Sequence, residues 1–400
     1  MTQANKKRAS SLRKVLILRP DNLGDVLLFS GALVRIRGHY PCARIILVVK
    51  KSVRPLVELC PYVDKIVNWE SLTNPLGSIG LFLSKTKGLW RFNAVARFIR
   101  CFFMKSDLIL LPVRSPSGGL SGMHQIVKII PAREKIGISG DFCNQSLLED
   151  GRADGYYTQR LKLIPCQKED HELVITYRFL KFLGIKGLPK TLWPELWTNK
   201  SDRIWAESAI SPRLQGNIMI AIAPGVTSIP GKFYPGKNYA QAFSKVTGKT
   251  FQVVILGNSA EKSMCDEVEM ALKGLKHIQG VTNLSGKTTI RQFVECIRLC
   301  DLLISEETGA LHIGVALKRP TIGIVGGGHF KRFYPWGDPE INRIANFPME
   351  CYGCNWECRY SEAKCIQKIK PDQIADHIRI LLDFIDLGTR NNRKPVLVPC

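Results

Sequence analysis

The sequence of 400 residues lacks any uninterrupted run of about 18 apolar residues, the length that a membrane-spanning helix requires. It also lacks the pattern of a secretion signal, because the basic N-terminus leads directly into the short run VLILRP, which Arg19 and Pro20 interrupt. The 13 cysteines are an odd number, which without a secretion signal argues against a disulfide framework. We therefore expect a cytosolic protein with reduced cysteines.

Acidic residues are scarce. There are 34 Asp and Glu against 57 Lys and Arg, which gives a formal net charge of +23. Such an excess favours an anionic partner, namely nucleic acid, an anionic membrane face or a phosphorylated substrate. A basic nucleic-acid-binding protein is therefore one alternative, but the sequence has no recognisable nucleic-acid motif and few aromatics between its basic runs. We expect no nucleic-acid partner.

Short apolar runs alternate with helix-like segments in two separate regions. The first region contains the runs KVLILRP, ARIILVVK, DKIVNW and SDLILLPV, and the second contains NIMIAIAPG, FQVVILG, CDLLIS and PTIGIVGGG. Strands that alternate with helices predict an α/β fold with parallel sheets. We predict domains at 1–190 and 216–370, a linker at 191–215, and a last segment, 371–400, whose helix packs back on the N-terminal domain.

The stretch RPDNLGDV follows the first predicted strand and opens a helix. Ligand sites form at the carboxyl edge of parallel strands, so Asp25 is expected to face that edge. A carboxylate in this position can take a proton from a hydroxyl nucleophile. Asp25 can equally serve as a helix-capping residue, which is common at a helix start.

The loop APGVTSIPGKFYP leaves the first strand of the second region and carries a single lysine, Lys232. Backbone amides, the hydroxyls of Thr227 and Ser228, and the Lys232 ammonium could together bind a diphosphate. A solvated loop lysine is the alternative.

The stretch ILGNSAEK ends a strand at Gly257 and opens a helix with Glu261. The Glu261 carboxylate can accept hydrogen bonds from a ribose diol. It can also be a first-turn glutamate that the helix dipole favours.

The stretch EETGALH follows the apolar run DLLIS. Thr308 and Gly309 stand where the amides and the dipole of a helix start favour a diphosphate. Glu307 is too acidic for a phosphate contact, so we expect it to face sugar hydroxyls. His312 lies one turn inside the helix, where we expect a packed or amide-orienting histidine. Downstream, the glycines of Gly326–Gly328 indicate either a plain turn or, with the basic residues that follow, an anion-binding loop.

Four cysteines cluster at Cys351, Cys354, Cys358 and Cys365. Four thiolates at such short spacing could bind zinc or a cluster. A reduced structural loop and a redox-sensitive patch are equally open interpretations.

The segment 80–105 combines Trp and Phe with Lys and Arg and contains no acidic residue. It could lie on an anionic membrane surface, with apolar side chains buried beside cationic ones. An ordinary domain helix with a solvated basic face is the alternative.

Taken together, these motifs resemble glycosyltransferase family 9, the lipopolysaccharide heptosyltransferase family. The resemblance rests on VLILRPDNLGDVLLFSGALVRIRGHYPCARI, IAPG with Lys232, ILGNSAEK and ETGALHIGVALKRPTIGIVG, and it extends over about 14–371. It implies a GT-B architecture, in which two Rossmann-like domains face each other across a cleft. The N-terminal domain would bind the acceptor and the C-terminal domain the nucleotide-sugar.

The resemblance also implies an inverting transfer that needs no metal or other cofactor. The donor would be an ADP-heptose-like nucleotide-sugar and the acceptor an anionic glycolipid, such as the lipopolysaccharide core, at the inner face of the cytoplasmic membrane. Asp25 matches the catalytic base, Lys232 the phosphate-binding lysine and Glu261 the ribose-binding residue. Thr308, Gly309 and His312 match the donor-binding helix start.

One departure concerns Glu307, where the family pattern has an aspartate before Thr-Gly. The extra methylene moves the carboxylate by about one carbon–carbon bond, ~1.5 Å, which bears on the identity of the donor sugar. A transferase that uses another nucleotide-sugar, a sugar-nucleotide epimerase on the same architecture, and a scaffold without activity are the alternatives within this fold.

Overall fold

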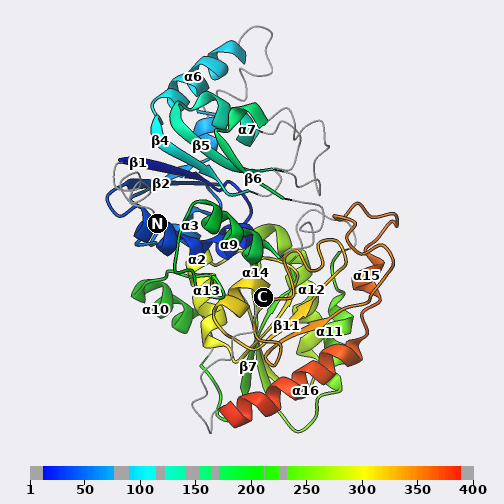
Figure 1. Ribbon diagram of the computed structural model, residues 1–400. Helices are drawn as coiled ribbons and strands as arrows, with labels where there is room; N and C mark the ends of the chain where they lie inside the picture. Colours follow the sequence, from blue (N-terminus) through cyan, green and yellow to red (C-terminus); the bar gives the residue numbers. More distant parts are fainter. Residues whose placement is uncertain are drawn as a thin grey trace. The chain divides into compact units, whose positions relative to one another are not determined.

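The computed structural model describes residues 12–75, 90–113, 122–139, 154–163, 171–210, 212–225 and 232–388. The chain divides into two compact units, Met1–Pro194 and Glu195–Cys400, and the division falls inside the segment 191–215. Each unit is built on one six-stranded sheet (Figure 1). The predicted fold class, α/β with two Rossmann-like domains, is confirmed.

The sheet of the N-terminal unit has the strand order β3-β2-β1-β4-β5-β6, and every neighbouring pair is parallel. This is the Rossmann-like order, with its topological switch point between β1 and β4. The strands are β1 (Lys14–Leu18), β2 (Arg44–Val49), β3 (Lys65–Asn68), β4 (Ser106–Leu111), β5 (Ala132–Ser139) and β6 (Gln159–Lys162).

Helices cover both faces of this sheet. Leu16 and Leu18 of β1 belong to a core cluster with residues of α6 and α7, whereas α2 packs with α9 on the other face (Figure 1). Because successive residues of a strand point to opposite faces, a continuous apolar run such as β1 fits a sheet that is covered on both sides. The helices are α2 (Leu23–His39), α3 (Arg54–Val57), α4 (Glu70–Thr73), α6 (Trp90–Phe102), α7 (Gly122–Ile129) and α9 (Glu172–Phe182), with a 3-10 turn, η1 (Asp154–Tyr156).

The C-terminal unit repeats this topology. Its sheet has the order β12-β11-β10-β7-β8-β9, again all parallel, and its switch point lies between β7 and β10. The strands are β7 (Ile218–Ala223), β8 (Phe251–Ile255), β9 (Ile278–Asn283), β10 (Leu302–Glu306), β11 (Thr321–Ile324) and β12 (Asn342–Ala345). The helices are α10 (Lys200–Ala209), α11 (Gly236–Ser244), α12 (Lys262–Lys273), α13 (Ile290–Leu299), α14 (Gly309–Ala316), α15 (Lys364–Gln367) and α16 (Pro371–Gly388), with a 3-10 turn, η3 (Ser259–Glu261).

Helix α16 belongs to the C-terminal unit, so the expectation that it packs on the N-terminal domain is wrong. Its apolar stripe, which includes Ile374, Ile378 and Leu381, is fully buried in the core cluster of the C-terminal sheet. The helix contacts α11, β11 and β12 (Figure 1). Without α16, this face of the sheet would expose a large apolar surface, which explains the packing.

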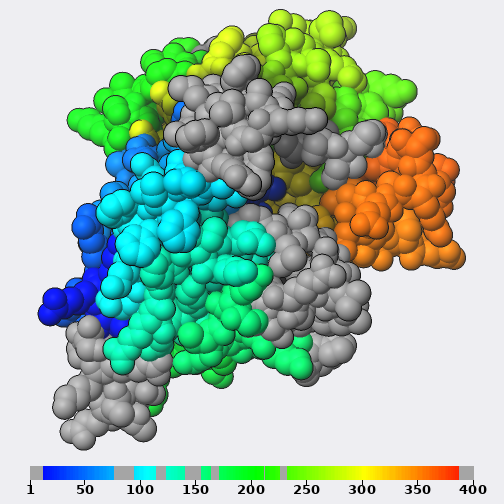
Figure 2. Space-filling model, turned by 90° about the horizontal axis from the view of Figure 1, so that it is seen from above, coloured from blue at the N-terminus to red at the C-terminus, as the bar shows by residue number. Residues whose placement is uncertain are grey.

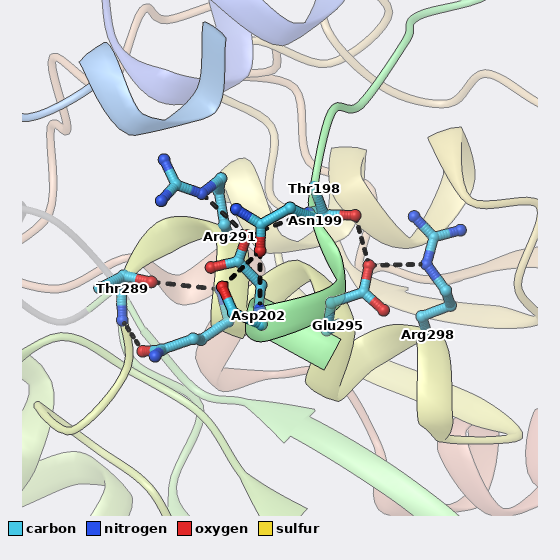
Figure 3. Close-up of polar contacts among 9 residues, drawn as sticks. Thr198, Asn199, Asp202, Thr289, Arg291, Glu295 and Arg298 are labelled. Carbon is cyan, nitrogen blue, oxygen red and sulfur yellow. Dashed lines mark hydrogen bonds and ion pairs between the residues drawn. The ribbon is translucent and has the colours of Figure 1, made fainter. Parts of the chain in front are cut away.

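Helix α10 was not predicted, and a buried polar network fixes it against α13 (Figure 3). Arg291 Nε donates to Oδ2 of the buried Asp202 at 2.9 Å. The carboxylate of Glu295, also buried, accepts from Thr198 Oγ1 at 2.6 Å and from Arg298 Nε at 3.0 Å. In the part of the chain that the structure describes, no helix is both long enough and apolar enough to cross a membrane.

Candidate active site

The switch point of the C-terminal sheet brings two predicted loops together. Strands β7 and β10 are neighbours, with Ile222 opposite Ile304 and Ala223 opposite Ser305. The loop that carries Lys232 follows β7, and Glu307 with Thr308 follows β10 directly. Both loops therefore emerge side by side at the carboxyl edge, where open α/β sheets bind ligands.

Lys232 is a buried cation, with only 7% of its surface exposed. Its Nζ lies 3.4 Å from the backbone oxygen of Glu307 and 3.9 Å from the ring centroid of Trp356. Burial lowers the pKa of Lys232, and the nearby carboxyl groups of Glu307 and Glu306 oppose that shift. The solvated-loop interpretation of Lys232 is therefore wrong, whereas Thr227 and Ser228 lie outside the described residues.

Glu306 is a fully buried carboxyl group that connects the two loops. Its Oε1 accepts from the backbone N–H of Tyr234 at 3.0 Å, and its Oε2 has no hydrogen-bond partner among the described residues. Burial raises the pKa of Glu306 well above its ordinary value, which favours the protonated form of this carboxyl group. Glu306 was not among the residues predicted for the site, although an acidic residue that closes an apolar strand is the signal that marks it.

Glu307 is buried as well, with 9% exposed. The backbone N–H of Gly326 donates to its carboxylate, but Oε2 has no partner within the described ranges. Burial raises the pKa of Glu307 to about 7, although Lys232 works in the opposite direction. A buried carboxylate with an unused acceptor atom beside a buried cation is suited to a ligand that offers a hydroxyl.

Thr308 begins helix α14 as its N-cap, and its hydroxyl accepts from the N–H of Ala310 at 3.4 Å. The first turn of α14, which starts at Gly309, therefore lies at the carboxyl edge of the sheet. The positive end of the helix dipole is at this turn. His312 lies one turn further and is 5% exposed. The indole N–H of Trp336 donates to His312 Nδ1 at 2.9 Å, so this nitrogen carries no proton.

Glu261 lies in the first turn at the start of α12, which is one of the two alternatives that its sequence context left open. It forms a capping box with Asn258, whose backbone N–H donates to Glu261 Oε2 at 2.8 Å. The same carboxylate lies against the β7 loop, because a Cβ on Gly225 would stand 2.4 Å from Glu261 Oε1. Gly257 allows a similarly close approach, since a Cβ there would lie 2.7 Å from the sulfur of Cys265.

The glycine loop Gly326–Gly328 packs against the segment 351–365, which follows β12, contains the four clustered cysteines and is called the cysteine loop below. Added Cβ atoms on Gly327 and Gly328 would lie 2.1 Å from the ring of Tyr352 and 2.3 Å from that of Trp356. The carbonyls of Gly327 and Gly328 accept from the backbone N–H groups of Gly353 at 2.8 Å and of Asn355 at 2.9 Å. The glycines therefore permit close packing of two aromatic rings.

The four clustered cysteines are free thiols, and within the described ranges no three His, Cys, Asp or Glu residues form a group that could hold a metal ion. Cys365 is buried and its sulfur accepts from the N–H of Gly327 at 3.5 Å. Burial raises the pKa of both Cys354 and Cys365, which favours the neutral thiol in the arrangement that the structure shows. As arranged here, the cluster does not fit a metal site.

In the N-terminal unit, Asp25 is the third residue of α2 and is partly exposed. It follows β1 at the switch point of that sheet. Arg19 was not predicted to have a role at this site. It is almost fully buried and contacts the turn between β1 and α2. Its Nη2 donates to the backbone oxygen of Asp25 at 3.2 Å, its Nε pairs with Asp21 at 3.1 Å, and its Nη1 donates to the carbonyl of Pro112 after β4.

Comparisons with known proteins agree with the α/β fold of the two units. The family described as "Glycosyltransferase family 9 (heptosyltransferase)" matches residues 146–361. Lipopolysaccharide heptosyltransferase 2 of Escherichia coli (strain K12) is 24% identical over 321 residues, which are 78% of this chain and 82% of that protein.

Two solved structures share the fold. The family 9 glycosyl transferase from Veillonella parvula DSM 2008 has a TM-score of 0.68 at 17% identity, over 93% of this chain and 98% of that one. The E. coli ADP-heptose lps heptosyltransferase II has a TM-score of 0.62 at 18% identity, over 93% and 99%. Because the family match extends over more than half of the 400 residues, the chain belongs to glycosyltransferase family 9 and is a glycosyltransferase.

Proposed function

We propose that this protein moves a heptose from an ADP-heptose donor onto a lipopolysaccharide-core acceptor, with inversion at the anomeric carbon. The donor and the acceptor are those named for the similar E. coli proteins. The observation that carries the proposal is the buried ammonium of Lys232 beside the start of α14 at a topological switch point.

The proposed reaction is a single displacement. Asp25 takes the proton of an acceptor hydroxyl, and the hydroxyl oxygen attacks the anomeric carbon of the donor. The bond between that carbon and the diphosphate oxygen breaks, and ADP leaves with the bonding electrons. Attack opposite to the leaving group inverts the anomeric configuration.

The departing diphosphate gains negative charge, and the C-terminal unit offers two sources of positive potential. Lys232 supplies a full charge in a site where burial weakens solvent screening. The amides of Thr308 and Gly309 supply the partial charge of a helix start. Removal of one such preorganised donor typically costs ~3–4 kcal/mol of transition-state stabilisation. We propose that Thr227 and Ser228 add hydroxyl contacts.

Two carboxylates are proposed to bind the ribose and the transferred sugar of the donor. Glu261, beside Gly225 and Gly257, would accept hydrogen bonds from the ribose diol. Glu307 would accept from a hydroxyl of the transferred sugar through its unpartnered Oε2. His312 would act through packing, by holding the first turns of α14 against Trp336.

A glycolipid acceptor implies a place of action, and we propose the inner face of the cytoplasmic membrane. The net charge of +23 supports attraction to an anionic lipid surface.

Thermal stabilisation by nucleotides tests the donor site. A ligand that binds only the native state at ~100 times its Kd stabilises it by ~2.7 kcal/mol. We expect ADP to raise the melting temperature of the wild type, and the Lys232→Met variant to lose this response. Lys237→Met is the matched control, because Lys237 is an exposed lysine in the neighbouring helix α11.

A donor panel then separates the proposal from its alternatives. ADP-heptose, ADP-hexoses and uridine-linked sugars are offered with a heptose-deficient lipopolysaccharide core, and products are identified by mass spectrometry. Transfer from ADP-heptose supports the proposal. Transfer only from another donor would retain the mechanism. It would indicate that Glu307, with its extra methylene, selects a donor sugar other than heptose. Epimerised nucleotide-sugar without transfer would refute the reaction.

A further inference from the structure

Helix α6 exposes an unusual amount of apolar surface. Of the eleven large hydrophobic side chains that are exposed in the described parts of the chain, five lie on α6 or directly after it. These are Val95 (56%), Phe98 (56%), Ile99 (49%), Phe102 (53%) and Phe103 (78%). A contiguous exposed apolar patch of this kind marks an interaction surface.

The five residues form one stripe on the outside of the helix. Their spacing of i, i+3, i+4, i+7 and i+8 places them on one helical face. The opposite face holds α6 to its own unit, because Cys101 is fully buried and Arg97 Nε donates to the backbone oxygen of Thr73 at 3.0 Å. Helix α6 is cyan in Figure 2, where it lies at the surface.

The charged residues of the segment that carries the stripe are all basic. Arg100 and Lys105 are both exposed, and the segment 80–105 contains no acidic residue. A second copy of the chain docked on this face around a two-fold axis would bring like charges together, which opposes association. Anionic lipid headgroups above an acyl layer match both the charge and the apolar stripe.

We propose that the Val95–Phe103 stripe docks on an anionic bilayer surface. Val95, Phe98, Ile99, Phe102 and Phe103 enter the boundary between headgroups and acyl chains. Arg100 and Lys105 pair with headgroup phosphates. This inference goes beyond the proposed reaction and rests on it only in that a glycolipid acceptor resides in a membrane.

Vesicle flotation of the full-length protein tests the proposal without any donor. The vesicles contain either phosphatidylglycerol with phosphatidylethanolamine or phosphatidylcholine alone. We expect the wild type to bind the anionic vesicles, to bind phosphatidylcholine vesicles at least tenfold more weakly, and to lose affinity for the anionic vesicles as salt increases.

Two double variants separate the apolar and the charged contributions. Phe98→Ser with Phe102→Ser should weaken binding to anionic vesicles at least tenfold. Arg100→Gln with Lys105→Gln should weaken it about fivefold for each cation removed.

Matched controls change exposed residues of the same kinds elsewhere. Ile204→Ser with Met270→Ser replaces side chains that are 53% and 72% exposed, and Lys186→Gln with Lys190→Gln removes two exposed lysines. Both control variants should bind as the wild type does. Retention of the wild-type melting temperature shows that each variant is folded.

Three results would overturn the proposal. They are absent vesicle binding by the wild type, unchanged binding by the Phe98/Phe102 variant, and a wild-type oligomer that this variant dissociates. The last result would assign the stripe to a second copy of the chain. Failure of the proposed reaction is a separate outcome, because it appears as a missing response to nucleotides in protein that still binds vesicles.

Discussion

The indole ring of Trp356 lies over the ammonium group of Lys232, with Nζ 3.9 Å from the ring centroid. Trp356 comes from the cysteine loop, which is docked on Gly326–Gly328, whereas Lys232 follows β7. Trp356 and the preceding Asn355 both adopt positive φ angles, of 63° and 51°, which non-glycine residues rarely do. A loop held in this conformation keeps the ring in place over the cation.

The ring should therefore matter for diphosphate binding. A cation–π contact of a desolvated ammonium contributes up to ~2 kcal/mol, which corresponds to about thirtyfold in an equilibrium constant. We expect Trp356→Leu to weaken ADP binding by about tenfold, and Trp356→Phe, which keeps a smaller ring, to lie between this variant and the wild type. Isothermal titration calorimetry measures both affinities.

Tyr352→Leu is the control for the integrity of the loop. Tyr352 packs on Gly327 in the same loop, and its hydroxyl donates to the backbone oxygen of Phe347 at 2.9 Å. Equal ADP affinities for Trp356→Leu and Trp356→Phe, or an equal loss in Tyr352→Leu, would assign the effect to loop packing instead of the cation–π contact.

Glu307 should make the stability of the ligand-free protein depend on pH. Its pKa is about 7 in the folded state against an ordinary value of 4.5, so between these values the folded state holds a proton that the unfolded state has released. Stability therefore falls as pH rises from about 5 to 7, by up to ~1.4 kcal/mol per pH unit. We expect Glu307→Gln to lack this decline, as measured by chemical unfolding across that range.

Glu340→Gln provides the comparison, because Glu340 is exposed and should leave the pH dependence of the wild type unchanged. Parallel curves for the wild type and Glu307→Gln between pH 5 and pH 7 would contradict the assignment.

The sequence predicted the central strands of both sheets because these strands are continuous apolar runs. Strands β1, β2, β3, β4, β7, β8, β10 and β11 all coincide with predicted runs. Strands β5, β6, β9 and β12 were not predicted. They contain many polar residues, as in QRLK and IQGVTN, because they lie at or near the edges of the sheets where burial is incomplete.

The candidate site was only partly predictable. Lys232 and Glu307 stand in recognisable motifs, so the adjacency of their loops follows from the strand order. The ring of Trp356 belongs to a loop more than 100 residues away from Lys232 in the sequence, and no local pattern links the two. The cysteine spacing left a metal site, a reduced structural loop and a redox-sensitive patch open, and in the structure the loop packs through its aromatic rings.

The Asp25→Asn variant distinguishes a catalytic role of Asp25 from a role in the stability of helix α2. If it is the base, Asp25→Asn should lower kcat by at least ~100-fold and leave the affinity for ADP unchanged, because an amide cannot accept the proton. Steady-state kinetics with the donor and acceptor identified above, together with thermal unfolding, checks this prediction. Glu58→Gln, an exposed change in the same unit, should retain full activity. A drop in melting temperature without a drop in kcat would assign Asp25 to stabilising the first turn of α2 alone, where Asn22 is the N-cap.

The network around Asp202 should hold α10 to the rest of the C-terminal unit. Asp202 is 5% exposed, forms a capping box with Asn199 and accepts from Arg291 at 2.9 Å (Figure 3). Asp202→Ala removes the half of the capping box that its side chain forms with the Asn199 N–H, and leaves the Arg291 guanidinium, which is 20% exposed, without this partner. We expect the free energy of unfolding to fall by ~2–3 kcal/mol in urea titrations.

Arg203→Ala tests whether any change on α10 has this effect. Arg203 pairs with Glu207 on the same helix, and both side chains are largely exposed. Such surface pairs contribute little to stability because water and salt screen them, so this variant should unfold as the wild type does. An equal loss in both variants would place the effect in the helix itself, whereas a loss confined to Asp202→Ala would assign it to the contacts between α10 and α13.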